Sequence, residues 1–67
     1  MLLTLNGRGV ETTALYLHKL LQEQGLQPES KGIAVAINGE IVPRSEWATT
    51  ELGNGDAIEM ITAMQGG

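Results

Sequence analysis

The chain has 67 residues, 42% of them hydrophobic, and it contains no cysteine. This length supports one domain, because a chain of this size buries only about 60% of the surface that it exposes when unfolded. The formal net charge is -4, so the chain lacks the excess of basic residues that is expected of a protein that binds nucleic acid. Without cysteine there can be no disulfide, redox thiol or thiolate metal site.

The first residues, "MLLTLNGRG", lack the pattern of a signal peptide. No apolar run approaches the length that spans a membrane. We therefore expect a small cytoplasmic domain without a membrane partner.

Two Asn-Gly pairs follow strand-like runs and predict β-hairpins. Asn6-Gly7 follows "LLTL", and Asn38-Gly39 follows "IAVAI". A two-residue type I′ turn needs positive φ at both central positions, which Asn and Gly tolerate best. The expected strand pairs are Leu2–Leu5 with Arg8–Thr12 and Ile33–Ile37 with Glu40–Val42.

Between the hairpins, an apolar stripe at helical spacing predicts the main helix. The stripe consists of Ala14, Leu17, Leu20 and Leu21. We expect Thr12 or Thr13 to cap the start of the helix. Gly25 suits the left-handed position just past its end, where Leu26 would fold back onto Leu21.

The last third of the chain predicts a short helical turn and a final strand. Pro43 ends the preceding strand, because it has no backbone N–H to donate. Ser45 is expected to cap a single turn that holds Glu46 and Trp47. The run "GNGD" is a turn signal, and the final strand is expected at Ala57–Met64.

This order of elements predicts the fold. A helix that crosses between two hairpins must cover one face of a mixed sheet to bury its apolar stripe. The expected class is α+β, a ubiquitin-like β-grasp, with residues 1–67 forming one domain. Residues 64–67 would be a flexible tail after the last strand.

The side chains offer little for catalysis or metal binding. His18 is the only histidine, and no partner is spaced to converge on it, so we expect a solvated helix residue. The acids lack the ligand spacing of a calcium loop and predict a solvated face; these are Glu46, Glu51, Asp56 and Glu59. "GNGD" lacks the lysine of a phosphate loop. For Trp47, a position in the core is preferred over the alternative of an anchor for a partner protein. No bound cofactor and no metal site are predicted.

The terminal "GG" is the remaining candidate, with the carboxylate of Gly67 as its reactive group. A carboxylate is inert as an acyl donor until its oxygen becomes a good leaving group, which an acyl-adenylate provides. Gly66 has no Cβ and can pass through a narrow channel together with Gln65. From Met64 to Gly67 the chain could reach about 13 Å into another protein.

Three stretches, "AINGEIVPRSEW", "NGDAIEM" and the final "GG", resemble the ThiS family of thiamine-biosynthesis sulfur carriers. The resemblance implies a β-grasp whose Gly67 carboxylate is adenylated from ATP by a partner related to ubiquitin-activating enzymes. It further implies conversion to a thiocarboxylate, with sulfur from a donor enzyme such as a cysteine desulfurase. Thiazole synthase would then accept the sulfur.

Docking to such partners is expected on the open face of the sheet, around Ile58, Met60 and Met64. The alternative is that these residues belong to the core, which is the preferred interpretation for Ile58. Three other functions stay open at this point: the small subunit of molybdopterin synthase, a ubiquitin-like modifier joined to lysines, and an interaction module.

Overall fold

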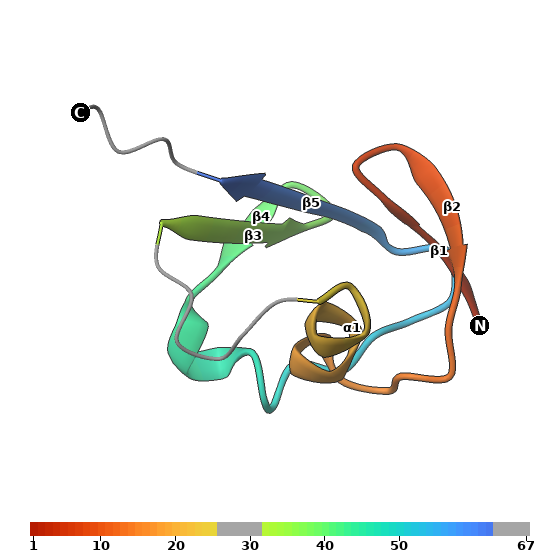
Figure 1. Ribbon diagram of the computed structural model, residues 1–67, viewed down its shortest axis with the longest axis horizontal. Coiled ribbons are helices and arrows are strands. Elements are labelled where there is room, and N and C mark those ends of the chain that lie inside the picture. Colours follow the sequence, from red (N-terminus) through yellow and green to blue (C-terminus); the bar gives the residue numbers. More distant parts are fainter. Residues whose placement is uncertain (26–31, 63–67) are drawn as a thin grey trace.

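The computed structural model describes residues 1–25 and 32–62, which form one sheet with an α-helix across one face (Figure 1). The elements in chain order are β1 (Leu2–Leu5), β2 (Arg8–Glu11), α1 (Leu17–Glu23), β3 (Ile33–Ile37), β4 (Glu40–Val42), a 3-10 turn (Arg44–Glu46) and β5 (Ala57–Thr62). The strands lie in the order β2-β1-β5-β3-β4. β1 and β5 are parallel, and the other neighbours are antiparallel. The mixed sheet and β-grasp are thus confirmed.

Both predicted hairpin turns are present. Asn6 and Gly7 have φ values of 51° and 82°, and Asn38 and Gly39 have 52° and 86°. Positive φ at both central positions is the geometry of a type I′ turn. Three of the four hairpin strands have the expected bounds, and β2 ends one residue early, before Thr12.

The expected helix cap at Thr12 or Thr13 is wrong, because α1 begins only at Leu17 and its N-cap makes no side-chain hydrogen bond. Thr12 is buried and uses its hydroxyl elsewhere. The hydroxyl accepts a hydrogen bond from the Ala14 N–H at 2.9 Å and donates one to the Glu23 carboxylate at 2.6 Å. Such local bonds offer the backbone an alternative to the helix.

The segment before α1 is held in place by a distant part of the chain. The Leu52 N–H donates to the Leu15 carbonyl at 2.8 Å, and Tyr16 forms an isolated antiparallel bridge with Glu51. These contacts satisfy backbone groups that a longer helix would have used internally. Ala14 is still buried in the core, so the apolar stripe is correct although its first member lies outside the helix.

The end of α1 agrees with the prediction. Gly25 lies just past the C-cap with a φ of 89°, and its N–H donates to the Gln22 carbonyl at 3.0 Å. Glycine adopts this left-handed conformation without the steric cost that a Cβ brings. The contact expected between Leu26 and Leu21 lies outside the described residues.

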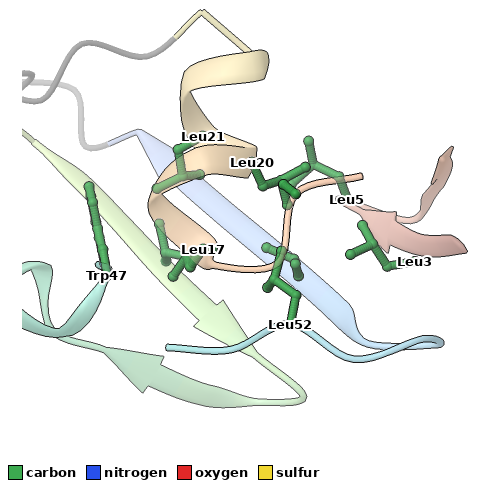
Figure 2. Close-up of a cluster of buried hydrophobic side chains, with 10 residues drawn as sticks. Leu3, Leu5, Leu17, Leu20, Leu21, Trp47 and Leu52 are labelled. Atoms are coloured by element: carbon green, nitrogen blue, oxygen red, sulfur yellow. The ribbon is translucent and has the colours of Figure 1, made fainter. Parts of the chain in front are cut away.

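The core fills the space between α1 and the sheet. Figure 2 shows leucines of α1 facing those of β1, with Trp47 and Leu52 beside them. The most deeply buried side chains are Leu3, Leu17, Leu20, Val35 and Ile58. Full burial of an aliphatic side chain contributes about 1.5–3 kcal/mol, so these residues supply much of the driving force for folding.

A single 3-10 turn follows β4, but Ser45 does not cap it. Pro43 ends β4 as expected and occupies the N-cap position, which leaves Ser45 inside the turn. The turn places Trp47 in the core, where its indole N–H donates a hydrogen bond to the Val42 carbonyl at 2.9 Å. The core role predicted for Trp47 is confirmed.

The predicted turn before β5 aligns that strand with β1. The Asp56 carboxylate accepts a hydrogen bond from the Gly53 N–H at 2.7 Å. Gly55 has a φ of 86°, and its N–H donates to the Leu2 carbonyl at 2.8 Å. β5 then runs from Ala57 to Thr62, and the last two residues of the predicted strand lie outside the described residues.

Candidate functional site

β5 is the strand that leads toward the candidate reactive residues. Met64, Gln65, Gly66 and Gly67 follow it in the sequence and lie outside the described residues, as does the whole predicted tail. The roles predicted for them stay predictions. The described part of the site is therefore the end of β5 and the surfaces that border it.

β5 is the central strand and is paired on both sides, but to different lengths. Antiparallel pairing with β3 extends from Ile37 opposite Ile58 to Ile33 opposite Thr62. Parallel pairing with β1 covers only the first part of β5, up to Leu5 opposite Ile58. β3 thus accompanies β5 to its last described residue, whereas β1 stops pairing four residues earlier.

The Asn6 side chain continues the hydrogen bonding to β5 beyond the point where β1 stops pairing. Its Oδ1 accepts a hydrogen bond from the Met60 N–H at 2.8 Å, and its Nδ2 donates to the Met60 carbonyl at 3.2 Å. The Asn6 backbone N–H also donates to the Ile58 carbonyl at 2.8 Å. Sequence reasoning used Asn6 only as a turn residue and missed this contact. Asparagine instead of glycine at that position is the only local signal for it.

Asn38, in the second hairpin turn, makes the equivalent contact at the beginning of β5. Its Oδ1 accepts from the Ala57 N–H at 3.0 Å, and its backbone N–H donates to the Ala57 carbonyl at 2.7 Å. Its Nδ2 donates to the Asp56 carboxylate at 3.1 Å. The two Asn-Gly turns therefore hold β5 near both ends.

Two of the predicted docking residues face the helix. Ile58 is 1% exposed and belongs to the core, and Met60 is partly buried against that core. Their expected position on the open face of the sheet is wrong, and the alternative considered for Ile58, membership of the core, is confirmed. Met64 lies outside the described residues. The alternation along β5 instead places Ala57, Glu59 and Ile61 on the open face.

The open face, opposite α1, carries an apolar patch next to the end of β5. We call it the open-face patch and define it as Ala34, Ala36, Ile41 and Ile61. Ala34 lies directly opposite Ile61 in the sheet, and Ala36 lies opposite Ile41. Ile61 is 57% exposed and Ile41 is 66% exposed. Ala34 is also exposed, whereas Ala36 is 6% exposed. Apolar side chains that lie exposed next to one another are typical of protein interaction sites.

His18 does not fit the expectation of a solvated helix residue. It is half-buried, and its Nδ1 is buried without a hydrogen-bond partner in the described part of the chain. Its backbone N–H donates to the Trp47 carbonyl at 3.0 Å, and the Tyr16 ring centroid lies 6.5 Å from its own. No second catalytic side chain is brought to the imidazole by these contacts.

The predicted acidic face is only partly solvated. Glu46, Glu51 and Glu59 are exposed, whereas Asp56 is half-buried in the turn that precedes β5. Over residues 1–25 and 32–62, no group of three or more His, Cys, Asp or Glu side chains is arranged to hold a metal ion. Within the same residues, no helix is long and apolar enough to cross a membrane.

Comparisons with known proteins agree on one family. The model of the ThiS family matches residues 3–67. The sulfur carrier protein ThiS of Escherichia coli (strain K12) is 39% identical over 51 residues, which cover 76% of this chain and 74% of that protein. A crystal structure of the thiamine biosynthesis protein ThiS from Geobacter metallireducens matches with a TM-score of 0.82 and 30% identity, covering all of both chains. A solution structure of a thiamine biosynthesis protein from the same organism gives a TM-score of 0.77 at 30% identity, covering all of this chain and 88% of the other.

Proposed function

Because this chain belongs to the ThiS family, we propose that it carries sulfur as a thiocarboxylate on Gly67. It is a sulfur carrier protein of thiamine biosynthesis, on which enzymes act, and it is not itself an enzyme. The family match extends through residue 67, and this observation supports Gly67 as the residue that carries the sulfur. The proposal takes Gly67 as the residue with the free carboxylate.

The first step activates this carboxylate. A carboxylate oxygen of Gly67 attacks the α-phosphorus of ATP, a new O–P bond forms and pyrophosphate leaves. The resulting acyl-adenylate has AMP as a good leaving group, which the free carboxylate lacks. The partner is an adenylating enzyme related to ubiquitin-activating enzymes. Since this step consumes ATP, we assign the reaction to the cytoplasm.

The second step installs sulfur. A sulfur nucleophile attacks the carbonyl carbon, the C–S bond forms, and the C–O bond to AMP breaks. When the donor is an enzyme-bound persulfide, as a cysteine desulfurase would provide, the product is an acyl disulfide. A thiol then cleaves its S–S bond, releasing the Gly67 thiocarboxylate and forming a disulfide with the donor sulfur. Thiazole synthase would accept the carried sulfur. The carrier itself holds no cofactor in this scheme.

The body of the domain has to dock so that the tail can react. Ordering a tail costs about 1–2 kcal/mol per residue in backbone entropy, which contacts of the folded part must offset. We assign this docking to the open-face patch, because Ile61 lies one residue from the end of β5 and is 57% exposed. The net charge of -4 favours a partner with a basic surface around the contact.

A pyrophosphate-exchange assay with a candidate adenylating enzyme tests the activation step. We expect exchange of labelled pyrophosphate into ATP that depends on the wild-type chain. Deleting Gly67 should abolish the exchange, while the thermal unfolding curve stays unchanged because β5 ends at Thr62. Exchange that persists without Gly67 would contradict the proposal.

A further inference from the structure

We propose that Asn6 is a positioning residue that fixes the end of β5, from which the chain continues toward Gly67. This inference rests on the proposed function and extends it to a residue in the first hairpin, 54 positions from Met60. Asn6 does not touch the reacting atoms. It acts through the backbone of β5.

The side-chain amide of Asn6 takes the place of the backbone peptide unit that β1 would supply if it continued along β5. At Asn6 the backbone has a φ of 51° and turns away from β5 into the hairpin. A side-chain amide has the same planar C=O and N–H groups as a peptide unit. Asn6 uses both of them on Met60, at 2.8 Å and 3.2 Å, and so extends the parallel pairing by one more position.

The orientation of the amide follows from its partners. The Met60 N–H can only donate, so it must face Oδ1, and the Met60 carbonyl can only accept, so it must face Nδ2. Both backbone groups of Met60 are thereby bonded toward the β1 side. These are the last hydrogen bonds that the described residues make to β5 on that side, because β1 itself pairs only as far as Ile58.

The location of this contact links the docking surface to the tail. Met60 precedes Ile61, the member of the open-face patch on β5, and β5 ends at Thr62. Holding Met60 therefore fixes the spatial relation between the docked patch and the start of the tail. Reaction at a terminal carboxylate depends strongly on such placement, since a misplacement of about 1 Å can cost on the order of 100-fold in rate.

Asn38 provides a control within the same molecule. It occupies the same position in the same type of turn and also bonds to the backbone of β5 through its side chain. Its contact is at Ala57, the first residue of the strand, far along the strand from the tail. Glycine suits the positive φ of both asparagines, so Asn6→Gly and Asn38→Gly remove the side-chain contact and preserve the turn.

The first measurement is amide hydrogen exchange of the free protein. The Asn6→Gly variant should exchange its Met60 N–H roughly two- to tenfold faster, the effect of losing one hydrogen bond. The Asn38→Gly variant should show the same effect at Ala57 and leave Met60 protected. An unchanged Met60 exchange rate in Asn6→Gly would overturn the inference.

The second measurement is steady-state activation by the adenylating enzyme, at a temperature where circular dichroism shows both variants folded. Asn6→Gly should lower kcat about tenfold with KM nearly unchanged, because the patch still docks while the carboxylate is misplaced. Asn38→Gly should keep both constants. Asn6→Asp retains the acceptor but places a second acceptor against the Met60 carbonyl, and it should lower kcat too.

The two proposals fail in different ways. Equal kcat values for Asn6→Gly and Asn38→Gly, or wild-type kcat for Asn6→Asp, would overturn the positioning role alone. Absence of activation with the wild-type chain would contradict the proposed function and this inference together.

Discussion

The two faces of β5 carry the same type of residue in opposite environments. Ile58 is 1% exposed and lies in the core, whereas Ile61, three residues later, is 57% exposed on the open face. Alternation along a strand separates the two side chains, and α1 covers only the face of Ile58. One face thus stabilises the domain, and the other leaves apolar area for a partner. The proposed function uses both faces, because the folded body would dock on a partner while the terminus reacts.

Among substitutions on the two faces of β5, Ile58→Ala is expected to have the largest effect, a loss of folding stability. Truncating a fully buried isoleucine costs about 2–5 kcal/mol, through lost burial and the cavity that remains. A domain of this size has about 3–5 kcal/mol of stability from its core, so the variant should be largely unfolded. Urea denaturation followed by tryptophan fluorescence measures this through Trp47. A variant as stable as the wild type would contradict the assignment of Ile58 to the core.

A smaller effect on stability and a selective effect on docking are expected for Ile61→Arg. An exposed substitution should change the free energy of unfolding by about 0.5 kcal/mol or less. The buried arginine charge and the lost apolar contact should raise KM for the adenylating enzyme about tenfold, the size typical of an important interface residue. Steady-state activation kinetics measure the change.

Leu2→Arg is the matched control for that variant. Leu2 is also 57% exposed on the open face, but it belongs to β1 and lies beyond the opposite end of β5. Its substitution should leave KM unchanged. Equal increases in KM for Ile61→Arg and Leu2→Arg would show that added charge, and not the open-face patch, determines the effect.

The features predicted correctly from the sequence are those that a few neighbouring residues determine. The turns at Asn6 and Asn38 need only positive φ at two adjacent positions, and the end of α1 needs only a glycine at position 25. The order of elements then restricts the sheet to few topologies, which is why the β-grasp could be predicted.

The errors arose where contacts between distant parts of the chain decide the structure. The bridge between Tyr16 and Glu51 keeps the chain extended before Leu17, although the local sequence suits a helix there. The alternation of Ile58 and Met60 was visible, but which face α1 covers depends on the register of β5 with β1 and β3. The contact between Asn6 and Met60 likewise exists only once the sheet has formed.

Intact-mass spectrometry tests the central claim, that Gly67 carries the sulfur, most directly. The chain is incubated with the adenylating enzyme, ATP and a persulfide donor with a thiol, and the modified residue is then located by fragmentation. We predict the mass gain of exchanging one oxygen for one sulfur, located at the carboxylate of Gly67. Sulfur found at any other residue, covalent adducts to other proteins, or an unchanged mass after demonstrated adenylation would contradict the account.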